Sequence, residues 1–276
     1  MTINQIKEIL LGNPTAEQIE ELSQDKRVAV QKLLQSYHKR CEKAALEKER
    51  FHKMLSYERQ YYDEGAKLIA GVDEAGRGPL AGPLVIAAVI LPQDIFISGL
   101  NDSKQISASK RDKLYDEILA KAISISVNIV SISNIDELNI YRATQVGMAE
   151  VLLNLDQQPD VALIDAMPVE AGNIQTVSLV HGDALSASIA AASIVAKVTR
   201  DRIMEKLAVL YPAYGFAGNK GYGSKEHMQA IKIEGATPWH RRSYEPVKSM
   251  NLDPVKKRDN ILYSPLKDGY EYEPQN

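Results

Sequence analysis

The sequence is poor in cysteine and has no long apolar run. Cys41 is the single cysteine among 276 residues, which excludes an intramolecular disulfide, and no cluster of Cys and His predicts a zinc site. The longest apolar run, from Leu84 to Leu91, has the length of a strand, whereas a membrane-spanning helix needs about 18 apolar residues or more. The N-terminus also lacks the pattern of a secretory signal. We therefore expect a soluble, cytoplasmic protein.

The sequence also has no excess of basic residues. It contains 33 Lys and Arg against 36 Asp and Glu, which gives a net charge of −3 and a pI of about 6.0. Nucleic-acid-binding domains are usually more basic, so the overall charge argues against such a partner, although a local basic patch can coexist with an acidic site. The composition, 45% hydrophobic and 25% charged, predicts an ordinary globular core. The length fits one large domain or a domain with an appendage.

Three segments differ in their residue patterns. Residues 1–65 are charged and have helical spacing, and we interpret them as a helical N-terminal extension. It includes a capping box formed by Thr15 and Gln18 and a long amphipathic helix over residues 26–62. The charged face of this helix could contact nucleic acid or simply be solvated. Residues 66–250 form the predicted catalytic domain, and residues 251–276, rich in Pro, Tyr and Lys, form a C-terminal tail that covers the surface or lacks order.

Apolar runs and helical periodicities alternate within residues 66–250. The predicted strands cover residues 68–72, 85–91, 123–131, 161–164 and 176–180. The predicted helices cover residues 107–122, 139–155, 184–210 and 224–234. Strands that first follow one another and then alternate with helices indicate an α/β domain with a mixed sheet. The first half of the helix over 184–210 consists of small residues, which allow a helix backbone to lie close to a sheet.

Four acidic residues stand at the ends of these elements. Asp73 and Glu74 follow a buried strand, Asp165 closes another strand, and Asp183 opens the long helix of small residues. Functional groups gather where the strands of an α/β sheet end, and carboxylates that converge there repel one another unless a cation neutralises them. Oxygen ligands without His or Cys favour Mg²⁺ or Mn²⁺. Two such ions, about 3.5–4 Å apart, would support phosphodiester hydrolysis.

A simpler interpretation of these acids remains open. An Asp-Glu pair after a strand can merely begin a turn, and Asp183 can be an ordinary helix cap. Adjacent residues of a regular strand also point to opposite faces. Asp73 and Glu74 would therefore share a site only if the backbone turned there, and Gly76 and Gly78 supply that freedom.

Two loops contain groups suited to nucleic acid. The bare backbone of Gly76-Arg77-Gly78 could approach a strand and bond to a ribose 2′-OH, although the motif alone predicts only a turn. Lys104 could meet a phosphate. Tyr222, between two glycines, could stack on a sugar or base, or could equally pack as an ordinary surface ring.

Several ordered motifs resemble the bacterial ribonuclease HII family over about residues 67–250. The motifs are AGVDEAGRGPLAGP at 70–83, LNDSK at 100–104, LIDA at 163–166, GD at 182–183, SIAAASIVAKVTRD at 188–201, YGF at 214–216 and KGYG at 220–223. Arg77 separates the chain from the ribonuclease HIII type, whose turn reads Gly-Thr-Gly. One departure is Ala166, where the family typically has Gly. The leader, residues 1–65, is similar to that of Gram-positive members.

The resemblance implies a ribonuclease H-like fold, a five-stranded mixed sheet flanked by helices, with a helical C-terminal part. It implies that Asp73, Glu74, Asp165 and Asp183 bind two divalent ions, Mg²⁺ or Mn²⁺, and catalyse hydrolysis.

The expected substrates are RNA–DNA hybrids and duplex DNA that contains ribonucleotides. The Gly76-Arg77-Gly78 backbone would read the 2′-OH, Tyr222 would pack on the next deoxyribose, and Lys104 would contact the substrate. The family cuts 5′ to a ribonucleotide, leaves 3′-OH and 5′-phosphate ends, and serves in removing ribonucleotides from DNA. We expect a monomer.

Two other functions share some of these features. A hybrid-binding protein that has lost catalysis would lack one of the acids, and all four are present. A junction resolvase or transposase would share the acidic metal site but would have no use for a turn that reads a 2′-OH.

Overall fold

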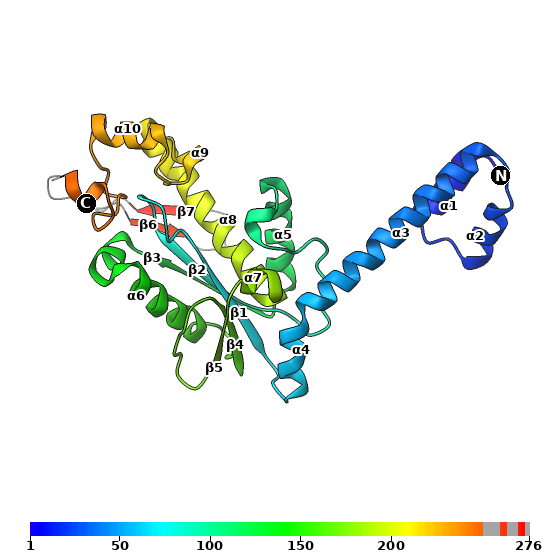
Figure 1. Ribbon diagram of the computed structural model, residues 1–276, viewed down its shortest axis with the longest axis horizontal. Helices are drawn as coiled ribbons and strands as arrows, with labels where there is room; N and C mark the ends of the chain where they lie inside the picture. Colours follow the sequence, from blue (N-terminus) through cyan, green and yellow to red (C-terminus); the bar gives the residue numbers. More distant parts are fainter. Residues whose placement is uncertain (251–259, 264–269, 274–276) are drawn as a thin grey trace. The chain divides into compact units, whose positions relative to one another are not determined.

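The computed structural model describes residues 1–250, 260–263 and 270–273, which form two compact units, Met1–Lys53 and Met54–Asn276 (Figure 1). Within these residues no helix is both long enough and apolar enough to cross a membrane. The predicted C-terminal tail, residues 251–276, lies outside the described residues except for two short antiparallel strands, β6 (Asn260–Tyr263) and β7 (Tyr270–Glu273).

Helices make up the N-terminal unit. They are α1 (Ile3–Leu11), α2 (Ala16–Ser23) and α3 (Val28–Met54). The predicted capping box is confirmed, because the Gln18 N–H donates to Thr15 Oγ1 at 3.2 Å and the Thr15 N–H donates to Gln18 Oε1 at 2.9 Å. A small core holds the three helices together and consists of Ile6, Leu10, Leu22, Val30 and Leu34.

The prediction of one helix over residues 26–62 is wrong at Leu55. Helix α3 ends at Met54, and α4 (Ser56–Asp63) follows after Leu55, whose φ of −91° and ψ of 9° leave the helical region. The amphipathic pattern continues across the break, so periodicity alone could not reveal it. Helix α4 belongs to the second unit, where Glu58 is buried and accepts hydrogen bonds from Ser186 Oγ at 2.6 Å and from the Ser188 N–H at 2.9 Å.

A five-stranded mixed sheet forms the centre of the second unit, as expected (Figure 1). Its strands are β1 (Ile69–Ala75), β2 (Leu84–Ile90), β3 (Ser124–Val130), β4 (Val161–Asp165) and β5 (Gln175–Leu179). Their order is β3-β2-β1-β4-β5, with β1, β2 and β3 antiparallel in sequence and with β4 parallel to both β1 and β5. The carboxyl ends of β1 and β4 therefore lie side by side.

Each face of the sheet is covered by one long helix (Figure 1). Helix α6 (Ile132–Leu153) covers one face and packs its apolar side chains on Ala70 and Val72 of β1. Helix α8 (Ala187–Leu210) covers the other face. A Cβ added to Gly71 would lie 2.0 Å from the carbonyl carbon of Ser188, so the backbones of β1 and α8 approach closely. The predicted role of the small residues in this helix is thus confirmed.

Two predicted helix boundaries differ from the structure. Helix α6 begins at Ile132, capped by Ser131, instead of at Asn139, which marks a kink with φ of 62°. The Asn139 side chain accepts the Arg142 N–H at 3.1 Å and so caps the second half of the helix.

The helix predicted over 184–210 is also divided. Residues Gly182–Leu185 form the separate short helix α7, and Ser186 is extended and caps α8 by accepting the Ile189 N–H at 3.2 Å. Asp183 therefore lies on α7 and not on the long helix.

Between β2 and β3 lie η1 (Ser103–Gln105) and α5 (Ala108–Lys121), which corresponds to the helix predicted over 107–122. The C-terminal part is helical, as expected, and consists of η2 (Pro212–Tyr214), α9 (Phe216–Asn219), α10 (Lys225–Glu234) and η3 (Val247–Met250).

Candidate active site

The predicted acids lie at neighbouring strand ends. Asp73 and Glu74 are on β1, and Asp165 is the last residue of β4, which pairs with β1 through Val72 and Ile164. The backbone does not turn between the first two acids, as the sequence had led us to require. Strand β1 continues to Ala75, and the turn begins at Gly76 with φ of +100°. The Asp73 and Glu74 side chains thus leave opposite faces of the strand, yet both lie in the field of Asp165.

Asp73 is only 4% exposed. Burial, followed by the negative charges of Glu74 and Asp165, raises the pKa of the Asp73 carboxyl well above its usual range. The Ser193 hydroxyl and the Glu74 N–H, at 2.7 Å from Asp73 Oδ1, favour the ionised form but do not compensate for burial. A cation beside Asp73 would therefore stabilise its charged form.

Glu74 has an unsatisfied oxygen. Burial raises the pKa of Glu74 to about 7, although Arg77, whose Nη1 lies 3.6 Å from Glu74 Oε1, favours the charged form. Glu74 Oε2 is buried and has no hydrogen-bond partner within the described residues. A buried carboxylate oxygen without a donor is costly, and a bound cation would supply its missing partner.

Asp165 and Asp183 are joined through the backbone. Asp165 Oδ1 accepts the Gly182 N–H at 2.7 Å, which fixes the start of α7 against the end of β4. Asp183 follows directly and is buried. Burial first, then the charges of Asp102 and Asp165, raise the pKa of the Asp183 carboxyl.

Lys104 and two residues missed by sequence reasoning complete the acidic cluster. Burial alone would lower the pKa of Lys104, but nearby carboxylates, Asp73 first and then Asp183, outweigh burial and raise it. Lys104 thus lies in the field of the acids, next to the missed Asp102. The other missed residue is Ser193, whose hydroxyl is 2.9 Å from that of Ser103. Asp102 could have been indicated only by its position in the LNDSK motif, two residues before Lys104, and nothing in the sequence distinguishes Ser193 from its small neighbours.

The four predicted acids fit a hard divalent cation. All of their donor atoms are carboxylate oxygens, the pKa of three of the acids is raised, and Glu74 Oε2 has no partner. Within residues 1–250 no three His, Cys, Asp or Glu side chains are already grouped closely enough to hold a metal ion. The assignment of a divalent-cation site therefore rests on the chemistry of the donor atoms and not on a closed set of ligands.

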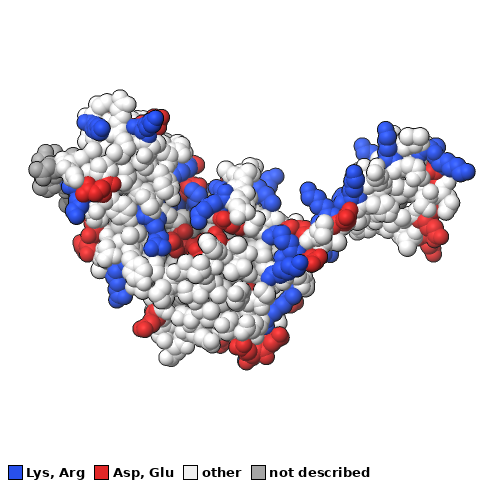
Figure 2. All heavy atoms as spheres, viewed as in Figure 1, with Lys and Arg blue, Asp and Glu red and all other residues white. Residues whose placement is uncertain are grey.

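The predicted glycine turn and Tyr222 lie close to one another. A Cβ added to Gly78 would lie 3.5 Å from Tyr222 Cε1, and the Tyr222 side chain is 52% exposed. The Leu80 N–H donates to the Gly221 carbonyl at 2.9 Å and joins the two loops. Figure 2 shows Asp, Glu, Lys and Arg atoms together in the hollow between the α9–α10 end of this unit and α5.

Two buried histidines lie beneath the Tyr222 loop. The Tyr222 carbonyl can only accept, so His227 Nδ1, 2.8 Å away, carries the proton. The Thr237 N–H donates to His240 Nδ1 at 2.9 Å, so His240 Nε2 is protonated and donates to His227 Nε2 at 3.0 Å. Protonation of either ring would place two donors against each other. Both histidines are therefore neutral.

Because both histidines are neutral in the folded chain, we expect the protein to lose stability in acid. Burial lowers the pKa of His240 to about 3, from an ordinary value of 6.5. Between about pH 6.5 and pH 3, His240 is therefore protonated in the unfolded chain but neutral in the folded chain. Stability from His240 is present above that pH and declines towards pH 3, by about 1.4 kcal/mol per pH unit. Urea unfolding at pH 7 and 5.5 should show a decrease about 1 kcal/mol larger in wild type than in His240→Gln. Equal decreases would contradict the neutral pair.

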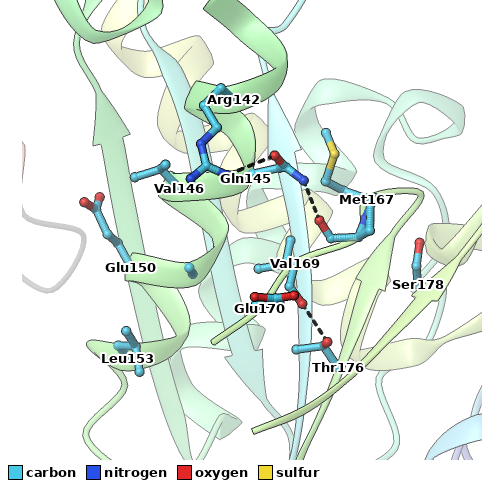
Figure 3. Close-up of a pocket in the computed structure, with 12 residues that line it drawn as sticks. Arg142, Gln145, Val146, Glu150, Leu153, Met167, Val169, Glu170, Thr176 and Ser178 are labelled. Atoms are coloured by element: carbon cyan, nitrogen blue, oxygen red, sulfur yellow. Dashed lines mark hydrogen bonds between the residues drawn. The ribbon is translucent and has the colours of Figure 1, made fainter. Parts of the chain in front are cut away.

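A separate cavity of about 590 Å³ lies between α6 and β5 (Figure 3). Its lining includes Arg142, Gln145, Pro168 and Thr176 but none of the predicted site residues. The Gln145 side-chain amide donates to the Pro168 carbonyl at 2.9 Å, and Thr176 Oγ1 donates to the Val169 carbonyl at 2.6 Å. These bonds fix the segment that follows Asp165.

Known proteins resemble the chain over most of its length. A family model described as Ribonuclease HII matches residues 70–247, and another, described as Ribonuclease HII N-terminal domain, matches residues 2–62. The Ribonuclease HII of Ligilactobacillus salivarius (strain UCC118) is 49% identical over 252 residues, which cover 91% of this chain and 98% of that protein. The Ribonuclease HII of Bacillus cereus (strain ZK / E33L) is 52% identical over 229 residues, which cover 83% of this chain and 89% of that protein.

A solved structure extends the likeness to the fold. The crystal structure of ribonuclease H2 from Pyrococcus horikoshii OT3 matches with a TM-score of 0.56 and 30% sequence identity. The match covers 66% of this chain and 96% of that one. The similarities together extend over the N-terminal helices and the unit that carries the acids.

Proposed function

Because the chain belongs to the ribonuclease HII family, and is thus an endonuclease that cuts the RNA of RNA–DNA hybrids, we propose that it cuts 5′ to a ribonucleotide at an RNA–DNA junction. Single ribonucleotides embedded in duplex DNA are included among its substrates. The observation that carries this proposal is the proximity of Gly78 and Tyr222 beside the acids, where an added Gly78 Cβ would lie 3.5 Å from the Tyr222 ring. Two groups that read successive sugars would have to be neighbours, and these are.

The four acids would hold two divalent ions, Mg²⁺ or Mn²⁺. When bound, the ions supply an activated water and stabilise the leaving oxygen. Asp73 and Glu74 would provide the buried part of the ligand set, and Asp165 and Asp183 the part fixed by the bond from the Gly182 N–H. Hydrolysis by water would leave a 3′-OH and a 5′-phosphate.

The remaining groups would recognise the substrate. Backbone N–H groups of the Gly76-Arg77-Gly78 turn would bond the 2′-OH, which distinguishes RNA from DNA. The exposed ring of Tyr222 would pack on the following deoxyribose. Lys104, which is already in the field of the acids, would contact the scissile strand.

Incision of a DNA duplex with one embedded ribonucleotide, in Mg²⁺ or Mn²⁺, tests the proposed function. We expect a single cut in the strand that contains the ribonucleotide and none in an all-DNA duplex of the same sequence. Absence of the cut, or equal cutting of the all-DNA duplex, would contradict it.

Tyr222→Ala should weaken junction cutting without affecting metal binding. Ring stacking contributes about 1–3 kcal/mol, so kcat/KM on the ribonucleotide-containing duplex should fall by roughly 10-fold or more. Tyr222→Phe, which keeps the ring, should retain most of the activity. Steady-state kinetics with metal titration provides the measurement. A similar loss on every substrate, together with weaker metal binding, would show that Tyr222 does not act in recognition.

We also propose a cytoplasmic monomer that acts in removing ribonucleotides from DNA.

A further inference from the structure

Arg241 is fully buried and bonds the glycine turn through its guanidinium. Nη1 donates to the Arg77 carbonyl at 2.7 Å, Nη2 donates to the Gly76 carbonyl, and Nε and Nη2 donate to the Gly82 carbonyl at 3.1 and 2.9 Å. Within residues 1–250 Arg241 forms no ion pair with a carboxylate. Burial of an unpaired cation is costly, so the carbonyls of this turn are its compensation.

The bonds from Arg241 also determine where the turn points its N–H groups. In a planar trans peptide the C=O and the following N–H point in opposite directions. Holding the Gly76 and Arg77 carbonyls towards Arg241 therefore directs the N–H groups of Arg77 and Gly78 away from it. In the part of the chain that is described, neither N–H has an acceptor. Both remain available to a hydroxyl of the substrate.

Tyr244 is the second donor to this turn. Its hydroxyl donates to the Arg77 carbonyl at 2.7 Å, and the Arg241 guanidinium lies 5.0 Å from its ring centroid. Arg241 Nη1 also donates to the Tyr244 hydroxyl at 3.1 Å. The Arg77 carbonyl thus has two donors from one short segment.

The same segment also holds the Tyr222 loop. His240 supports His227, whose Nδ1–H donates to the Tyr222 carbonyl. Backbone bonds add to this, since the Gly82 N–H donates to the Trp239 carbonyl at 2.9 Å and the Arg241 N–H to the Leu80 carbonyl at 2.8 Å. Residues 237–244 therefore contact both of the loops that would read the two sugars, and we call them the spacer segment.

We propose that the spacer segment sets the distance between the glycine turn and Tyr222, and that Arg241, Tyr244 and His240, with His227, are positioning residues for junction specificity. This inference rests on the proposed function. A ribose and the next deoxyribose can be read together only if both readers are held at a fixed separation. Loosening either contact should therefore reduce discrimination between substrates more than it reduces hydrolysis itself.

Two conservative variants test the contact with the glycine turn. Arg241→Lys keeps the charge but loses the fork that holds several carbonyls, and Tyr244→Phe removes only the hydroxyl. The measured quantity is the ratio of kcat/KM on DNA with one ribonucleotide to kcat/KM on a uniform RNA–DNA hybrid. We expect this ratio to fall by roughly 5-fold in Tyr244→Phe, from loss of about 1 kcal/mol, and further in Arg241→Lys. Metal affinity should not change.

Arg142→Lys is the matched control. Arg142 lies on α6, outside the spacer segment and both loops, and its Nη1 donates to Gln145 Oε1 at 3.4 Å, so the ratio should stay at the wild-type value. If the ratio is unchanged in Arg241→Lys and Tyr244→Phe, or if both substrates lose activity equally, the spacer segment has no role in specificity. If wild type makes no cut at the ribonucleotide, the proposed function fails as well.

A second experiment tests the contact with Tyr222. Asn at position 227 can place an N–H near the position of Nδ1, whereas Gln reaches the position of Nε2. We expect His227→Gln to lower the ratio of the two kcat/KM values, and His227→Asn to keep most of the wild-type ratio. In a double-mutant cycle the effect of His227→Gln should vanish in a Tyr222→Ala background. An undiminished effect in that background would show that His227 does not act through Tyr222.

Discussion

Replacing Asp73 by Asn should lower kcat on ribonucleotide-containing DNA on the order of 10³-fold or more. A metal ion contributes several kcal/mol of transition-state stabilisation, and each 1.4 kcal/mol is about tenfold in rate. Asn keeps the size of the side chain but removes the charge that would bind the ion. Affinity for Mn²⁺, measured by calorimetry, should fall with kcat.

The same substitution should stabilise the protein when no metal is present. Asp73 is buried, and Glu74 and Asp165 raise its pKa further, so its charged form is unfavourable in the folded chain near pH 7. Loss of that charge should raise the Tm by roughly 2–4 °C, which corresponds to about 1 kcal/mol in a protein of this size. Calorimetric melting in EDTA provides the measurement.

Asp160→Asn is the control for this pair of effects. Asp160 Oδ2 accepts the Lys67 and Leu68 N–H groups at 2.8 and 3.0 Å, at the end of β1 away from the acids. This variant should lose a little stability and keep its activity. If Asp73→Asn retains wild-type activity, Asp73 does not bind the catalytic metal ion. If the variant melts at a lower temperature than wild type without metal, the buried charge of Asp73 does not destabilise the folded protein.

Gly71→Ala should be the most destabilising small substitution in the sheet. Its Cβ would lie 2.0 Å from the Ser188 carbonyl carbon and 2.2 Å from the Ile189 nitrogen. Both are backbone atoms of α8, which cannot move aside as the end of a flexible side chain can. We expect a loss of about 3 kcal/mol or more in the free energy of unfolding, at the upper end of the overpacking range, as measured by urea unfolding.

Gly218→Ala is the matched control for that substitution. Gly218 lies in α9, and an added Cβ would meet nothing within 4 Å. The change should be neutral or slightly stabilising, since Ala favours a helix over Gly by about 1 kcal/mol. If the two variants unfold at similar denaturant concentrations, the close approach of β1 and α8 is not what the fold depends on.

The sequence predicts the position of the acids well and the helix breaks poorly. The apolar residues of β1 stop at Asp73 and those of β4 stop at Asp165, so both acids could be placed at the carboxyl ends of these strands in advance, although β1 itself continues to Ala75. The break at Ser186 could not be foreseen, because Ser lies within a run of small residues and acts as a cap only through its own backbone conformation. The break at Leu55 is hidden for a similar reason, since the apolar spacing continues through it.

The groups that hold the recognition loops could not be predicted at all. Arg241 bonds carbonyls that are 165, 164 and 159 residues away in the chain. Backbone carbonyls have no residue type, so nothing in the sequence marks them as partners. The pairing of the histidines near Tyr222 could not be predicted either, because the tautomer of each depends on contacts that the fold creates.

Mapping the cut in a DNA duplex with one embedded ribonucleotide tests the central claim most directly. The upstream product should end at the deoxyribonucleotide before the ribonucleotide with a 3′-OH, and the downstream product should begin with a 5′-phosphate on the ribonucleotide. Asp73→Asn should give neither product. A cut on the 3′ side of the ribonucleotide, or a 2′,3′-cyclic phosphate end, would contradict hydrolysis by water at the junction.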